Sequence, residues 1–286
     1  MPKLIYTGPS PHSGHRIDKY IRCPQLWAYS VMEPSPLPAR TESPALIKGS
    51  LGHVGLAHHY RRLQALQEGE DPSQWWEPLR AVEERAVTEG ASWLRYVTEV
   101  QHAVSEYLLH YGEQRVEVLG VEATYAMEVA WTGRTWPVTR SADLVVRAPG
   151  GAVRIVDHKF VGRLNDRTVS RYRLDGQFLD YALIGAREWG AAFDGAFLNL
   201  IEWPSKAGAT PKMKQLQAPS APAAVESRKA QLVYTHAQRS KIERAGVDLW
   251  NYPKRLNEQV CNGPYGLCAG ADLCAWGKVA ATNLPD

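Results

Sequence analysis

Two aspartates and a lysine stand near the ends of neighbouring predicted strands: Asp143 in "RSADLVV", and Asp157 and Lys159 in "RIVDHKF". Side chains alternate along a strand, so Asp157 and Lys159 share one face while His158 points to the other. Two carboxylates at short range repel each other unless a cation lies between them, and oxygen ligands suit Mg²⁺ or Mn²⁺. Lys159 could then orient a water molecule or stabilise negative charge on a phosphate. This set predicts metal-assisted hydrolysis of a phosphodiester bond.

Three polar residues on predicted helices extend this set. His53 in "GSLGHVGLAHH" follows a glycine-containing helix start, and a neutral imidazole there could supply a further metal ligand. Gln177 and Tyr181 in "DGQFLDYAL" are four residues apart and therefore share one helix face. The alternative for the two carboxylates and the lysine is a turn residue beside a surface ion pair on an edge strand.

The four cysteines are distributed unevenly, with Cys23 near the start and Cys261, Cys268 and Cys274 inside "CNGPYGLCAGADLC". Disulfides are disfavoured in a protein without an export signal, and closely spaced cysteines often hold a metal or a cluster. The alternative is that they are ordinary buried thiols. If Cys23 binds the same metal as the other three, the two ends of the chain must meet.

Hydrophobic periodicity indicates which elements position these residues. Helical spacing fills the first third of the chain and returns after a run of strand-like segments, which are separated by the turn signals "TGR" and "APGG". We expect an antiparallel meander within a small sheet that helices flank. Residues 204–225 are rich in Pro, Ala and Lys and are expected to form an exposed loop or loose hairpin. Helices are expected at 15–31, 49–68, 76–111 with a break at Gly90, 173–188 and 227–250, and strands at 116–131, 135–148, 152–160 and 195–203.

The order of these motifs resembles the RecB-like branch of the PD-(D/E)XK nuclease superfamily. A G-x-x-x-H helix, an Asp, a D-x-K strand and a Q-x-x-x-Y helix follow one another, and one cysteine before and three after them is the layout of the iron–sulfur members. Those members include CRISPR-associated RecB-like exonucleases and many phage nucleases. The resemblance implies an α/β, restriction-endonuclease-like core with a central mixed sheet flanked by helices, and a cluster of four cysteines that joins the N- and C-terminal segments.

Site roles follow from the resemblance, residue by residue. It implies that His53, Asp143 and Asp157 hold the catalytic metal, with the backbone carbonyl of His158 as a further ligand, and that Lys159 is the catalytic lysine. Gln177 and Tyr181 would fix the substrate strand or the surroundings of the lysine. A 4Fe–4S cluster would be ligated by Cys23, Cys261, Cys268 and Cys274.

Three features depart from the family pattern. The last three cysteines are separated by six and five residues, which leaves Zn²⁺ open as the occupant of the site. His158 follows Asp157 where an aromatic residue is usual, and "RSAD" replaces a "GRID"-like run. Neither of these two changes removes a metal-binding side chain. Glu122 in "GVEATY" is expected to be a strand-surface or supporting residue rather than a ligand.

Length and composition fit one folded domain. The chain has 286 residues, of which 44% are hydrophobic, and a net charge of +3 that neither shows nor excludes nucleic-acid binding. No apolar run or leader pattern indicates a membrane span or signal peptide, so we expect a cytoplasmic protein. We expect a single nuclease domain over 1–286, with a helical part at 15–115, a catalytic core at 116–202, a loop and helix at 203–260 and a cysteine segment at 261–274 that closes onto Cys23.

Basic residues near the predicted site suggest the substrate. Phosphate contacts from such residues position a nucleic-acid strand without reading its bases. Tryptophans 75, 76 and 93 are candidates for stacking on bases, with core packing as the alternative. The candidate DNA contacts are Arg163, Arg167, Arg171 and Arg173, and further lysines stand at 206, 212 and 214.

We therefore expect a Mg²⁺- or Mn²⁺-dependent DNA exonuclease that acts on single-stranded DNA or duplex ends. One alternative is a DNA-binding module for recombination or spacer capture, with incidental or no hydrolysis. Another is a zinc protein whose carboxylates are ordinary surface charges. The biological setting stays open between recombination, repair, phage DNA metabolism and CRISPR adaptation, each with its own protein partners.

Overall fold

The computed structural model describes residues 14–31, 37, 43–112, 115–173, 175–204, 206, 209–248, 251–254, 261–263, 266–268, 270 and 274. The chain divides into two compact units. Unit 1 is formed mainly by Glu42–Tyr125 and Arg140–Val225, and unit 2 by Ile5–Thr41, Ala126–Thr139 and Glu226–Asp286. Whether the chain behaves as one domain over 1–286 stays a prediction.

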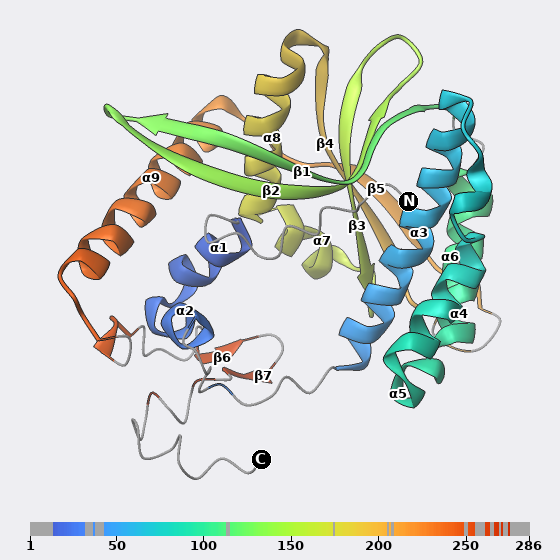
Figure 1. Ribbon diagram of the computed structural model, residues 1–286, viewed down its shortest axis with the longest axis horizontal. Helices are drawn as coiled ribbons and strands as arrows, with labels where there is room; N and C mark the ends of the chain where they lie inside the picture. Colours follow the sequence, from blue (N-terminus) through green and yellow to red (C-terminus); the bar gives the residue numbers. More distant parts are fainter. Residues whose placement is uncertain are drawn as a thin grey trace. The chain divides into compact units, whose positions relative to one another are not determined.

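A five-stranded mixed sheet forms the centre of the fold, in the order β1-β2-β3-β4-β5. Strands β2 and β3 are antiparallel, β3 and β4 are parallel, and β4 and β5 are antiparallel. The parallel pair requires a crossover, which α7 (Asp166–Arg173) and α8 (Gly176–Trp189) supply. The strands are β1 (Glu117–Trp131), β2 (Arg134–Arg147), β3 (Val153–Val161), β4 (Phe193–Glu202) and β5 (Met213–Gln217). The predicted α/β fold with a mixed sheet flanked by helices is confirmed (Figure 1).

Two turns set the order of the first three strands, as predicted. Thr132 and Gly133 connect β1 to β2 with φ angles of 46° and 73°, and positive φ at both central residues is typical of a type I′ hairpin turn. Gly150 and Gly151 provide positive φ between β2 and β3. Segment 204–225, predicted as a loop or loose hairpin, contains β5, which pairs with β4.

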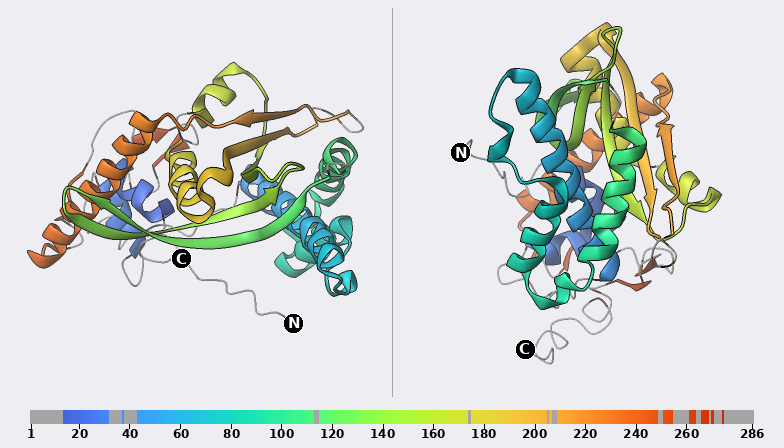
Figure 2. Two further views of the ribbon diagram at one scale, coloured as in Figure 1. Left: turned by 90° about the horizontal axis from the view of Figure 1, so that it is seen from above. Right: turned by 90° about the vertical axis from the view of Figure 1, so that its right-hand side faces the viewer.

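Helices α3 (Pro44–Glu68), α4 (Pro78–Glu89) and α6 (Val97–Tyr111) lie side by side in unit 1, as Figures 1 and 2 show. Their apolar side chains share one core with Leu144, Val146 and Val156 of the sheet. Ser43 caps α3 by accepting the Leu46 N–H, and the helix ends at Gly69 in the left-handed conformation. The short helices η1 (Pro72–Gln74) and α5 (Ala91–Leu94) flank α4, and the predicted break at Gly90 separates α4 from α5.

Unit 2 contains α1 (Gly14–Arg22), α2 (Pro24–Val31) and most of α9 (Pro222–Arg244), with the short strands β6 (Asn262–Gly263) and β7 (Gly266–Leu267). The prediction of one helix over 15–31 is wrong, because the helix is interrupted at Cys23. Proline disfavours helical backbone at the preceding residue, which explains a break directly before Pro24. Tyr20, Trp27 and Tyr252 form the core of this unit. Within the described part of the chain, no helix combines the length and apolar character needed to cross a membrane.

Candidate active site

Asp157 is the centre of the site and is fully buried in the middle of β3. Its Oδ2 lies 2.7 Å from Nζ of Lys159. Its Oδ1 accepts hydrogen bonds from Nε2 of Gln177 at 2.8 Å and from the hydroxyl of Tyr181 at 3.1 Å. The structure thus brings together four residues that the sequence pattern selected, and α8 lies against the face of β3 that carries Asp157.

The N-terminal turn of α8 is fixed by its own hydrogen bonds. Asp175 caps the helix by accepting the backbone N–H of Gln177 at 2.9 Å. The Gln177 amide donates to the Tyr181 hydroxyl at 2.6 Å, and that hydroxyl lies 2.8 Å from the carbonyl oxygen of Ser141. Gln177 and Tyr181 therefore connect Asp157 to β2 as well as to α8.

A buried ion pair also holds α8 to β2. Arg140 donates from Nε to Oδ2 of Asp180 at 2.7 Å, and both side chains are buried. No sequence motif indicated this pair, because Arg140 and Asp180 belong to none. Asp180 lies between Gln177 and Tyr181 in the sequence of α8, so the ion pair holds the same helix that contacts Asp157.

A second group of ligand atoms lies next to Asp157. His53, Glu122 and Asp143 each offer an atom, and these atoms all lie within 4.8 Å of one another. Nδ1 of His53 is 3.4 Å from Oδ2 of Asp143, which also accepts the backbone N–H of His158 at 2.8 Å. One imidazole and two carboxylates form a donor set that a divalent cation fits, so the residues present are compatible with the metal that the family pattern implies.

Glu122 is the member of this group that we did not expect to be a ligand. The structure brings its carboxylate to the ligand group, whereas we expected a strand-surface or supporting residue. Its φ of 49° is unusual for a residue other than glycine, and such an irregularity within a strand redirects a side chain. The segment "LGVEATY" lacks clean alternation of apolar and polar residues, and that was the available signal.

The charges of the site depend on one another. Burial alone would lower the pKa of Lys159, but the carboxylates of Asp157 and Asp143 raise it, so the ammonium form is favoured. Burial would raise the pKa of Asp143, but His53, the hydrogen bond from His158 and Lys159 together lower it. The pKa of Asp157 is raised by burial and by Asp143, against the effect of Lys159. Loss of hydration and the neighbouring Asp143 raise the pKa of Glu122 to about 7, although the residue is exposed on one side.

The glycine that brings α3 close to β3 is Gly52 rather than Gly49 of the G-x-x-x-H pattern. A Cβ on Gly52 would collide with the ring of Phe160, whereas a Cβ on Gly49 would meet open space. The same Phe160 ring contacts His53 edge-on, with ring centroids 5.9 Å apart. This close approach places His53 beside the carboxylates.

The basic and aromatic candidates for DNA contacts have different surroundings. Arg163, Arg167 and Arg171 are exposed on or just before α7, while the side chain of Arg173 lies outside the described residues. Trp93 is buried in the unit 1 core, so packing rather than base stacking explains it. Trp76 is 43% exposed with Arg80 over its ring, and Trp75 is half-buried under Arg61.

All four cysteines lie in unit 2 as free thiols. The backbone N–H of Cys268 donates to the carbonyl of Cys261 at 2.6 Å, next to the β6–β7 pair. Burial raises the pKa of the Cys274 thiol, and the nearby Cys23 and Cys268 raise it further. Among the described residues, no three cysteine sulfurs lie within 4.8 Å of one another.

An α/β fold with a D-x-K strand and an adjoining group of acidic and imidazole side chains is the arrangement of a candidate nuclease. A family model for the PD-(D/E)XK nuclease superfamily matches residues 11–276, and the chain belongs to this superfamily. An exonuclease candidate from Eubacterium rectale is similar in structure, with 12% identity and a TM-score of 0.48 over 91% of each chain. SSO0001 is similar with 14% identity and a TM-score of 0.32, over 64% of this chain and 74% of its own. A comparison with curated proteins finds no match.

Proposed function

We propose that this protein is a Mg²⁺- or Mn²⁺-dependent deoxyribonuclease of the RecB-like branch, acting as an exonuclease on single-stranded DNA or duplex ends. The observation that carries the proposal is the position of the Asp157–Lys159 pair beside His53, Glu122 and Asp143. A surface ion pair would not have its carboxylate fully buried in the middle of a central strand. A surface ion pair would also not be expected beside three side chains that could together bind a metal ion.

His53, Glu122 and Asp143 would hold the metal ion, with Asp157 and the His158 carbonyl as the further ligands that the family resemblance implies. When bound, the ion polarises a phosphate oxygen and lowers the pKa of a coordinated water. The side chains prepare the site for it. The lowered pKa of Asp143 keeps one carboxylate ionised, and the hydrogen bond from the His158 N–H fixes its orientation.

Lys159 would stabilise the negative charge that develops on the phosphate. Its ammonium is held 2.7 Å from Asp157, and its side chain is 24% exposed, so it is both fixed and accessible. A cation fixed before the reaction stabilises developing charge without the cost of reorganisation. Gln177 and Tyr181 bind the other oxygen of Asp157, which keeps Oδ2 directed at the lysine.

The DNA strand would be held by exposed arginines that follow β3. Arg163, Arg167 and Arg171 supply positive charge close in sequence to Lys159, and Arg173 is proposed to join them. Tyr172 on the same helix influences the pKa of Lys159, which places α7 near the lysine. Arginine contacts of this kind hold phosphates without reading bases, so they suit a nuclease of low sequence specificity.

The proposal is tested with single-stranded and duplex DNA labelled separately at the 5′ and 3′ ends. Cleavage is measured with Mn²⁺, with Mg²⁺ and with excess chelator. We expect cleavage that requires the metal, and early release of one label shows an exonuclease and its polarity. DNA binding without cleavage under every metal condition would favour the binding-module alternative.

We also propose that Cys23, Cys261, Cys268 and Cys274 ligate a 4Fe–4S cluster in unit 2. The thiols of Cys23 and Cys268 both act on the pKa of Cys274, so these three cysteines are near one another, which supports a shared site. Anaerobic purification should give a brown protein with iron and sulfide, and Cys268→Ser should lower both. A colourless protein with one zinc per chain would overturn the cluster assignment but not the nuclease proposal.

A further inference from the structure

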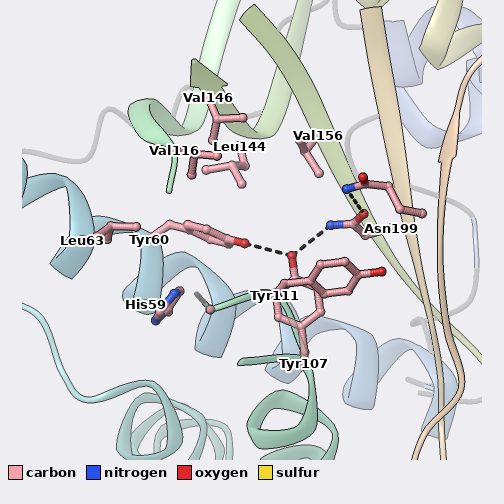
Figure 3. Close-up of a pocket in the computed structure, with 12 residues that line it drawn as sticks. His59, Tyr60, Leu63, Tyr107, Tyr111, Val116, Leu144, Val146, Val156 and Asn199 are labelled. Atoms are coloured by element: carbon pink, nitrogen blue, oxygen red, sulfur yellow. Dashed lines mark hydrogen bonds between the residues drawn. The ribbon is translucent and has the colours of Figure 1, made fainter. Parts of the chain in front are cut away.

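A chain of hydrogen bonds lies behind the candidate active site, among side chains of α3, α6, β3, β4 and β5. The Gln215 amide donates to Oδ1 of Asn199, and the Asn199 amide donates to the Tyr107 hydroxyl, both at 2.9 Å. The Tyr107 oxygen also lies 2.9 Å from the Tyr60 hydroxyl and 3.0 Å from Nε2 of His158. Figure 3 shows Tyr60 and Asn199 converging on the Tyr107 hydroxyl at the wall of a pocket.

The chain ends at a candidate metal ligand. His158 occupies the face of β3 opposite Asp157, its ring is buried, and its Nδ1 lies 3.8 Å from Oδ2 of Asp143. The same carboxylate oxygen accepts the backbone N–H of His158 at 2.8 Å. The backbone N–H and the ring Nδ1 of His158 both face Asp143, while Nε2 on the other side of the ring contacts the Tyr107 hydroxyl.

The geometry selects one direction for the hydrogen bonds. Tyr107 has a single hydroxyl hydrogen, which can be donated to Tyr60 or to His158. A hydrogen on Nδ1 of His158 is attracted by the carboxylate of Asp143, whereas a lone pair there would be repelled. Nε2 then carries the lone pair and accepts from Tyr107, and Tyr60 donates to Tyr107. In this arrangement the hydroxyls of Tyr60 and Tyr107, the Asn199 amide and Nε2 of His158 all take part in hydrogen bonds, and the Nδ1–H of His158 faces Asp143 at 3.8 Å.

Burial makes this arrangement rigid. Tyr107 is 1% exposed, and His158 and Asn199 are each 2% exposed, so loss of a hydrogen-bond partner among them is costly. Burial also raises the pKa of Tyr107 well above its usual value, which keeps the hydroxyl hydrogen available as a donor.

We propose that Tyr107 and Asn199 are positioning residues that hold His158 as the Nδ1–H tautomer, and that His158 in turn orients the Asp143 carboxylate for metal binding. The inference rests on the proposed function in one respect, which is that Asp143 is a metal ligand. Partners of this kind are commonly worth about 10- to 100-fold in metal affinity or activity. Tyr107 and Asn199 would act through the His158 ring.

The first test is the tautomer of His158 in the metal-free protein. Selective ¹⁵N labelling of histidine, with the His158 signal identified by its loss in His158→Gln, reports which ring nitrogen carries hydrogen. We expect Nδ1–H in the wild type and loss of this preference in Tyr107→Phe. An Nε2–H tautomer in the wild type would overturn the proposal, whether or not any variant folds.

The second test is Mn²⁺ binding measured by calorimetry without DNA. Tyr107→Phe should weaken binding by about tenfold, while the matched control Tyr111→Phe, at the same pocket, should bind as the wild type does. Equal Mn²⁺ affinity in Tyr107→Phe and the wild type would overturn the positioning role alone. A wild-type protein that binds no Mn²⁺ would instead remove the metal site, and the inference with it.

Discussion

The ring of Phe160 packs directly against the backbone of Gly52, at a distance that leaves no room for a side chain. Trp203 stacks on Phe160, with ring centroids 4.7 Å apart, so the ring cannot move away freely. The contact joins α3 to β3 one residue before His53. The distance between helix and strand therefore determines where the histidine stands.

Replacing Gly52 with alanine should push α3 away from β3. We expect a loss of about 1–3 kcal/mol in the free energy of unfolding, typical of overpacking, together with weaker Mn²⁺ binding because His53 moves. Urea denaturation and calorimetry measure the two effects. Gly49→Ala is the matched control on the same helix, and it should be neutral or stabilising because alanine favours helix and the site is open. Equal stability and equal Mn²⁺ affinity of Gly52→Ala and Gly49→Ala would contradict the role of the Gly52–Phe160 contact in positioning His53.

The raised pKa of Glu122 predicts a pH dependence of stability. Between the ordinary pKa of 4.5 and about 7, the folded protein binds a proton more readily than the unfolded chain does. The free energy of unfolding of the metal-free protein should therefore fall as pH rises through this window. Glu122→Gln should lack this part of the fall, and the exposed Glu128→Gln should keep it. The measurement is chemical denaturation in the presence of chelator at several pH values. Identical pH profiles of the free energy of unfolding for the wild type and Glu122→Gln would exclude a contribution from Glu122.

Affinity for the metal should change with pH in the opposite sense. Protons compete with Mn²⁺ for the Glu122 carboxylate, so binding to the wild type should tighten as pH rises through about 7. Calorimetry at the same pH values measures this, and a pH-independent affinity would count against Glu122 as a ligand.

The Arg140–Asp180 pair should be among the most sensitive positions of unit 1. Asp180→Asn removes the charge that Arg140 contacts at 2.6 Å, and breaking a buried ion pair costs about 3–5 kcal/mol. Glu117→Gln, in the exposed pair with Arg147, should cost less than about 1 kcal/mol. Chemical denaturation of both variants tests the contrast. A loss in Asp180→Asn no larger than in Glu117→Gln would show that the buried pair does not hold α8.

Much of the site could be predicted from local periodicity. Alternation along a strand placed Asp157 and Lys159 on one face, and the spacing of four residues placed Gln177 and Tyr181 on one helix face. Both inferences need only the regular geometry of a single element. The structure adds that the two faces meet, across the crossover that contains α7.

What could not be predicted depends on irregular backbone or on long-range pairing. Glu122 reaches the ligand group from a strand position with positive φ, and regular alternation would direct the side chain differently. Arg140 and Asp180 are forty residues apart and belong to no motif, so only the packed fold brings them together. The chain from Gln215 to His158 likewise joins residues that share no pattern. By contrast, the break at Cys23 had a visible signal in Pro24.

The most direct test of the central claim is the cleavage of end-labelled DNA by Lys159→Ala in the presence of Mn²⁺. The wild type and the control Lys229→Ala, whose lysine is 31% exposed and pairs with Glu226 on α9, should cut at similar rates. Lys159→Ala should be slower by about 100-fold or more, because a fixed charge at the phosphate is lost, while still binding DNA and Mn²⁺. Cleavage by Lys159→Ala at the wild-type rate would contradict the proposed role of the buried Asp157–Lys159 pair.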